Sequence, residues 1–139
     1  MLAKDVLLEI KEIKHKLDRD YLLLKYYDEE SKKITTISYD QIKTSSTKNT
    51  EAPFEKWVLK KLQKEHEIKE LEFRIEDLRL RMINYLEKIK SKEYMLIIMY
   101  RDLKFMKFEE IMSEMHLSRS SIYRIYNEAR TLIDNDKIL

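Results

Sequence analysis

Residues 68–89 read IKELEFRIEDLRLRMINYLEKI, and their apolar side chains recur at alternating intervals of three and four residues. This spacing places them on one face of an α-helix in a heptad pattern, which is typical of helices that pack lengthwise against a partner. The seam consists of Ile68, Leu71, Ile75, Leu78, Met82, Tyr85 and Ile89. A second buried stripe is predicted from four apolar residues off the seam: Phe73, Leu80, Ile83 and Leu86.

The seam belongs to a long coiled-coil-like helix predicted for residues 53–91, and Pro53 suits its first turn. An N-terminal helix is predicted for residues 1–27, although Asp20 takes a seam position there. Its apolar seam is Val6, Ile10, Ile13, Leu17 and Leu24. The first helix would be roughly 38 Å long and the second roughly 55 Å. Because the shorter helix cannot cover the longer seam, we expect a homodimer through the long helix.

Residues 28–52 differ in composition from both helices. They begin with Asp28-Glu29-Glu30 and end in a serine- and threonine-rich run at 44–50. The β-branched stretch 34–39 is compatible with a short strand or with extended chain. We therefore predict a polar loop over residues 28–52.

The composition excludes several classes of protein. The chain has no cysteine and no glycine, so it has no disulfide framework, no thiolate metal site and no glycine-rich phosphate loop. Its three histidines, His15, His66 and His116, lack a second ligand at metal spacing, and no catalytic pair is evident. We expect no metal, no cofactor and no enzymatic activity. Without an 18-residue apolar run or a secretory signal, we expect a cytoplasmic protein that does not enter a membrane.

The C-terminal part, residues 92–139, carries the most specific pattern. Helices are predicted for 93–102 and 107–115, and His116-Leu117 leads into a third helix over 118–132. Ser118 is a good N-cap residue for that helix. Its predicted buried side is Ile122, Ile125, Ala129 and Leu132. Two helices joined by about three residues are typical of a helix-turn-helix, in which the second helix enters the DNA major groove.

The terminal pattern resembles region 4 of the bacterial sigma-70 family. The matching residues are Arg101, Phe108-Glu109-Glu110-Ile111, Met115, Leu117-Ser118, Ile122, Ile125, Ala129-Arg130 and Leu132. The family usually has glycine in the turn, where this chain has Met115-His116, and alanine where it has Met112. The layout of the whole chain is similar to small phage and prophage regulators of the RinA/ArpU type. The resemblance implies an all-α fold, with a long helical hairpin followed by a sigma-70 region 4-like helix-turn-helix.

The resemblance also implies an activator of phage late genes that binds double-stranded DNA and has RNA polymerase as a further partner. The predicted DNA contacts are Arg119, Ser120, Ser121, Tyr123, Arg124, Asn127, Ser118 and Lys107. Arginine can form a two-pronged hydrogen bond with guanine, while hydroxyl groups and lysine suit phosphates. The helix N-termini near Ser118 and Phe108 can also hold phosphates.

Charge alone does not decide the function. The net charge is +2, and residues 92–139 carry eight lysines and arginines against eight acidic residues. Residues 119–130 hold three arginines against one glutamate, so a DNA-binding field would be local. Two alternatives therefore stay open. One is a small phage terminase subunit, and the other is an adaptor that docks on RNA polymerase without reading DNA.

Overall fold

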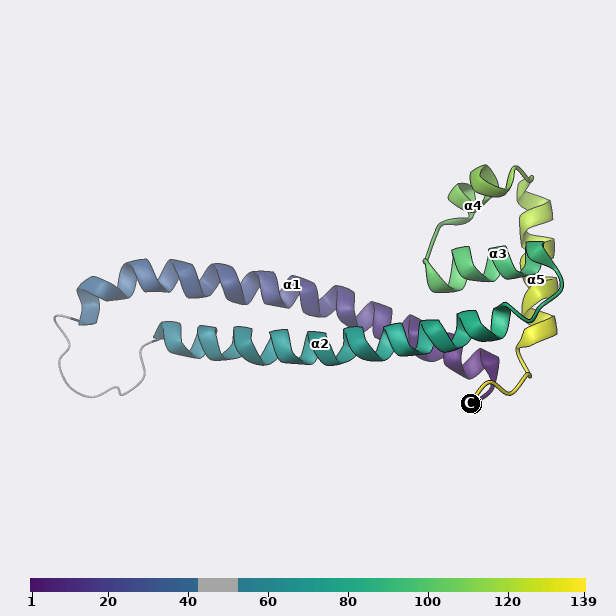
Figure 1. The fold of residues 1–139 in the computed structure, drawn as a ribbon. Coiled ribbons are helices and arrows are strands. Elements are labelled where there is room, and N and C mark those ends of the chain that lie inside the picture. Colours follow the sequence, from purple (N-terminus) through teal and green to yellow (C-terminus); the bar gives the residue numbers. More distant parts are fainter. Residues whose placement is uncertain (43–52) are drawn as a thin grey trace. The chain divides into compact units, whose positions relative to one another are not determined.

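The computed structural model describes the backbone of residues 1–42 and 53–139 and the side chains of residues 1–33 and 55–139. In this part of the chain every regular element is helical, which confirms the predicted all-α class. The elements are α1 (Ala3–Ile42), α2 (Pro53–Leu86), α3 (Lys92–Ile98), the π-helical turn η1 (Met99–Leu103), α4 (Phe108–Met115) and α5 (Arg119–Ile133) (Figure 1).

The chain forms two compact units. The terminal unit consists of Met1–Lys14 and Arg74–Leu139, and the middle unit is His15–Phe73. Both α1 and α2 contribute residues to each unit.

The middle unit is a pair of antiparallel helical segments whose seam contains a polar layer (Figure 1). Leu17 of α1 and Ile68 of α2 are buried in this seam, as their heptad positions predict. Asp20 is only 2% exposed, and its Oδ1 lies 3.5 Å from Nζ of Lys64, which also holds a seam position. The seam of α1 therefore accommodates a carboxylate at Asp20, because its charge is balanced by Lys64 of the opposite helix.

The polar residues after Tyr27 continue α1, so the loop predicted for residues 28–52 is wrong over residues 28–42. Asp28 forms ion pairs with Lys32, one turn ahead at 3.1 Å, and with Lys61 of α2 at 2.8 Å. The pair with Lys32 stabilises α1 from within, and the pair with Lys61 links this polar segment to α2. The suggested strand or extended chain at 34–39 is also helical, and residues 43–52 lie outside the described part.

Three predictions about the long helices need correction. α2 ends at Leu86 and not at residue 91, so Ile89 of the predicted seam lies beyond the helix. With 40 residues, α1 is longer than the 34-residue α2, so the argument that the first helix is too short to cover the seam fails. The second stripe is buried at Leu86 but not at Phe73, which is 81% exposed, or at Leu80. These two side chains lie on the outer side of α2, and α1 packs on the inner side.

In the terminal unit, α5 packs against α3 and α4 (Figure 1). Ile122, Ile125 and Ala129 are buried, as predicted. The last buried position is Ile133 rather than Leu132, which is 54% exposed. The helix continues one turn beyond Ala129, and the residue four positions on, not three, faces the core.

The two ends of the chain meet in the terminal unit. The backbone N–H groups of Ala3 and Lys4 donate to the carbonyls of Asp136 at 2.8 Å and Asp134 at 3.2 Å. The first N–H groups of a helix have no acceptor within that helix, so the C-terminal segment supplies the acceptors that α1 lacks. The segment after α5 thus helps to fix the start of α1.

Candidate nucleic-acid interface

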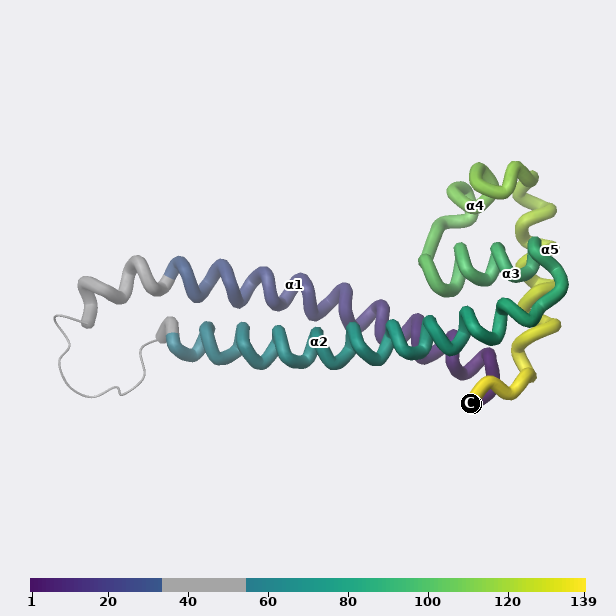
Figure 2. The backbone as a smooth tube through the Cα atoms, viewed as in Figure 1, coloured from purple at the N-terminus to yellow at the C-terminus, as the bar shows by residue number. Residues whose placement is uncertain are grey.

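The candidate interface is formed by α4, a short turn and α5, which follow one another along the chain (Figure 2). α4 ends at Met115, and its C-cap, His116, adopts the left-handed conformation with φ 54° and ψ 44°. Ser118 is the N-cap of α5, and its side chain accepts a hydrogen bond from the N–H of Ser121 at 3.4 Å. The left-handed residue and the cap together join α4 to α5 within three residues.

The left-handed residue leads to a testable prediction about stability. His116 occupies a conformation that is costly for residues with a Cβ atom and costs glycine nothing sterically. We expect His116→Gly to raise the free energy of unfolding by about 1 kcal/mol and the Tm by about 3 °C. Calorimetry measures the change. As a control, glycine at exposed Ser113 within α4 should lower the Tm, and a lower Tm for His116→Gly as well would contradict the assignment.

Most of the predicted contact residues share the outer face of α5. Arg119, Ser120, Arg124 and Asn127 are exposed, and Ser118 is exposed at the cap. Ser121 is half-buried, and its hydroxyl accepts a hydrogen bond from that of Ser118 at 3.0 Å. Lys107 is exposed at the N-cap of α4, without a capping side-chain bond. The structure thus brings the α5 residues together beside the turn, with Lys107 at the opposite end of α4.

Tyr123 contacts both an arginine and a second aromatic ring. Its ring lies 4.5 Å from that of Phe108 on α4, measured between centroids. Arg119 lies over the ring of Tyr123, with Cζ 5.6 Å from the ring centroid. A hydrogen bond with Tyr123 raises the pKa of Arg119 above its usual value. Tyr123 therefore supports Arg119 on the outer face while anchoring α5 to α4.

Arg124 has an acidic neighbour one turn along α5. Its NH1 lies 3.5 Å from Oε1 of Glu128. The other carboxylate oxygen of Glu128 accepts a hydrogen bond from the Tyr94 hydroxyl of α3 at 2.8 Å. That bond raises the pKa of Tyr94. No pattern in the sequence pairs Tyr94 with Glu128, because the two residues meet only through the packing of α3 on α5.

A polar network holds the inner side of α5 to η1. The Tyr126 hydroxyl donates to Oδ1 of Asp102 at 2.9 Å, and Arg130 NH1 lies 3.6 Å from Oδ2 of the same residue. Arg130 also donates to Asp134 at 2.7 Å, so its guanidinium belongs to this network. Burial raises the pKa of Asp102 despite the nearby Arg130. The same cause, burial, raises the pKa of Tyr126 to about 12.

The raised pKa of Asp102 predicts how stability depends on pH. A carboxyl group with a higher pKa in the folded than in the unfolded chain stabilises the fold below its unfolded pKa. That contribution is lost as pH rises through the folded pKa. The side chain introduced by Asp102→Asn is neutral throughout, so we expect the variant to gain stability relative to the original chain as pH rises from 3.8. Urea unfolding over a pH series measures this, and a pH-independent difference would contradict it.

The surface of α4 is acidic. Glu109, Glu110 and Glu114 are exposed, and Lys107 at its N-cap is the exposed cation beside them. Two of these glutamates lie in the first turn, where the helix dipole favours negative charge. The positive charge of the candidate interface is therefore confined to α5 and Lys107.

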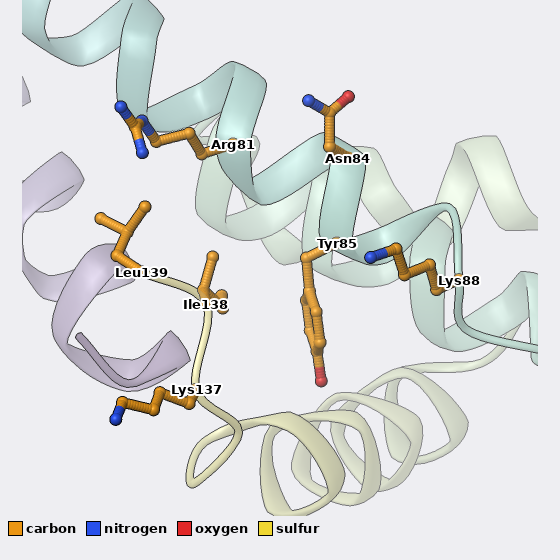
Figure 3. Close-up of a pocket in the computed structure, with 7 residues that line it drawn as sticks. All are labelled: Arg81, Asn84, Tyr85, Lys88, Lys137, Ile138 and Leu139. Carbon is orange, nitrogen blue, oxygen red and sulfur yellow. The ribbon is translucent and has the colours of Figure 1, made fainter.

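A small pocket lies at the far end of α5, beside the last turns of α2 (Figure 3). Its volume is about 250 Å³, and its lining is Arg81, Asn84, Tyr85, Lys88, Lys137, Ile138 and Leu139. Figure 3 shows Tyr85 extending from α2 towards the end of α5, where its hydroxyl bonds to Asp136. Arg81 is held by Asp77 at 3.1 Å, and Lys137 points away from Tyr85 in the figure. The cationic groups do not converge, so the pocket is explained by the packing of the C-terminal segment.

Other chemistries find little support in the described residues. No three histidine, aspartate or glutamate side chains among them are grouped so that they could hold a metal ion. No helix within the described ranges combines the length and apolar character that crossing a membrane requires.

A scan against protein-family models gave no match, and neither curated proteins nor solved structures gave one. The resemblance to sigma-70 region 4 therefore depends on the residues of this chain alone.

Proposed function

We propose that this protein is a sequence-specific regulator of transcription that places α5 in the major groove of double-stranded DNA. One observation carries the proposal. Arg119, Arg124 and Asn127 share the exposed face of α5, and the opposite face is buried through Ile122, Ile125 and Ala129. A helix fixed in this way presents its polar side chains as a rigid set, and the major groove is wide enough to admit it.

The proposed contacts follow from the chemistry of each side chain. Arg119 and Arg124 are the candidates for guanine O6 and N7, and Asn127 is the candidate for adenine or the backbone. Ser118, Ser120 and Ser121 lie at the N-terminus of α5, where hydroxyl and backbone N–H groups suit phosphate oxygens. Tyr123 supports Arg119, and Lys107 adds a phosphate contact from α4.

The resemblance narrows this proposal to an activator of phage late genes with a sigma-70 region 4-like helix-turn-helix, acting in the bacterial cytoplasm without catalysis. The left-handed His116 supports it, because the family usually has glycine in this turn and glycine favours that conformation. We also propose a homodimer through the outer side of α2. The exposed apolar side chains Leu59, Leu62 and Phe73 support that interface.

A second candidate is an adaptor that docks on RNA polymerase without reading DNA. The acidic surface of α4 favours it, since Glu109, Glu110 and Glu114 would oppose a DNA phosphate. Under the first proposal the duplex contacts α5 and leaves these glutamates facing solvent.

Selection of bound fragments from bacterial and phage genomic DNA tests the proposal. We expect the recovered fragments to share one sequence, with affinity that falls as salt rises because phosphate contacts release counterions. Recovery of no shared sequence, together with capture of RNA polymerase, would support the adaptor instead. Light scattering on the same preparation distinguishes a dimer from the ring of eight or more subunits expected of a terminase subunit.

A further inference from the structure

Glu128 stands out on the proposed reading face because it is the one acidic residue in α5. Its carboxylate lies between Arg124, at 3.5 Å, and the Tyr94 hydroxyl, at 2.8 Å. The side chain of Glu128 is 43% exposed and that of Arg124 is 64% exposed, so both are open to a ligand. A ligand that reaches Arg124 also meets the negative charge of Glu128.

We infer that Glu128, held in place by Tyr94, makes α5 selective by weakening contacts between Arg124 and DNA phosphates. This inference rests on the proposed function, and it assigns Glu128 as a specificity-determining residue and Tyr94 as the residue that positions it.

The bond from Tyr94 is what makes Glu128 effective. An exposed ion pair one turn apart on a helix is weak, and a flexible glutamate would turn away from an approaching phosphate. The hydrogen bond to Tyr94 joins a neutral hydroxyl to a charged oxygen, which makes it stronger than an ordinary one. Since Tyr94 belongs to α3, the carboxylate is fixed to a second helix and its charge stays beside Arg124.

A fixed carboxylate affects the two kinds of DNA contact differently. A phosphate is an anion, so Glu128 repels it wherever α5 lies on the duplex. The O6 and N7 atoms of guanine are neutral acceptors aligned for both prongs of an arginine. Glu128 does not repel them as it repels a phosphate, so they bind Arg124 with a smaller penalty. A repulsive group therefore weakens non-specific binding more than specific binding, and the preference for the correct site increases.

Two variants separate the charge of Glu128 from its structural contact. Glu128→Gln keeps an oxygen that can accept from Tyr94 but removes the negative charge. Tyr94→Phe keeps the negative charge of Glu128 but removes the hydrogen bond that holds its carboxylate in place. The matched control is Glu87→Gln, which makes the same change in net charge at an exposed residue of the same unit.

The experiment compares binding to a selected fragment with binding to a scrambled duplex of equal length, over a series of salt concentrations. We expect Glu128→Gln to tighten binding to the scrambled duplex on the order of tenfold, to raise the salt slope by about 1, and to tighten specific binding much less. Both Glu128→Gln and Tyr94→Phe should therefore reduce the ratio of the affinity for the selected fragment to that for the scrambled duplex. Glu87→Gln should leave this ratio unchanged.

Two outcomes would overturn the inference, and they can be told apart. In the first, the original chain prefers the selected fragment, and Glu128→Gln changes the affinity ratio no more than the control Glu87→Gln does. Glu128 then has only a structural role, and the proposed function stands. If the original chain binds both duplexes equally, the proposed function fails and the inference fails with it.

Discussion

Replacing Asp20 with alanine is expected to lower the free energy of unfolding by about 3 kcal/mol, the largest stability change that we predict for one side chain. The substitution leaves the Lys64 ammonium in the seam without the carboxylate 3.5 Å away. Breaking a buried pair by removing one partner costs about 3–5 kcal/mol. The lower end applies because Lys64 is 16% exposed on its side chain and keeps Glu67 at 2.7 Å.

Removing the charges of both Asp20 and Lys64 should change the free energy of unfolding much less. Asp20→Leu with Lys64→Leu replaces the polar layer by apolar side chains, and such exchanges are often neutral or stabilising. Trp57, the single tryptophan, lies in the same unit against Tyr26 and Tyr27, so its fluorescence reports the unfolding of this helix pair in urea. Exposed Glu29→Ala is the control. If Asp20→Ala unfolds at the same urea concentration as the original chain, the stabilising role of the buried pair is contradicted.

The double substitution Arg119→Ala and Arg124→Ala is expected to abolish specific DNA binding while leaving the helical content unchanged. Each two-pronged arginine contact with guanine contributes about 1–3 kcal/mol of discrimination. Losing two of them corresponds to a loss of roughly 30-fold to 10⁴-fold in specific affinity. Both residues are exposed, so the fold should not depend on them.

The double arginine variant needs a control that removes the same number of positive charges elsewhere in the chain. Lys11→Ala with Lys69→Ala removes two positive charges from exposed residues outside α5. We expect this pair to change affinity only slightly and equally for all duplexes. Titrations of both variants against a selected fragment, with circular dichroism for helicity, measure the difference. Retained specific binding by the arginine variant would rule out α5 as the reading helix, and unchanged activation of a reporter would favour the adaptor.

The local pattern of the sequence is sufficient to predict most of the helical segments and the N-cap at Ser118. The spacing of Ile68, Ile75 and Leu78 correctly marked a buried face of α2, and that of Ile122 and Ile125 did the same for α5. These features depend on residues within a few turns of each other.

The remaining features depend on residues that are distant in the sequence. The sequence does not show what balances the charge of Asp20 in the seam, because its partner, Lys64, lies 44 residues away. The helix past residue 27 was missed because Asp28 is stabilised by Lys61 of α2. In the candidate interface, the exposed arginines were predicted, but Glu128 acquired its partner Tyr94 only through the packing of α3 on α5. Spacing along one helix does not contain that information.

The most direct test of the central claim, that the exposed face of α5 contacts DNA, is photocrosslinking. A photoreactive amino acid at Ser120 or Asn127, both exposed on this face, is irradiated in the complex with a selected fragment, and the same group at Lys11 serves as the control. We expect covalent attachment to bases of the shared sequence from both α5 positions and none from Lys11. Attachment to protein alone, or the same yield from Lys11 as from α5, would contradict the proposal.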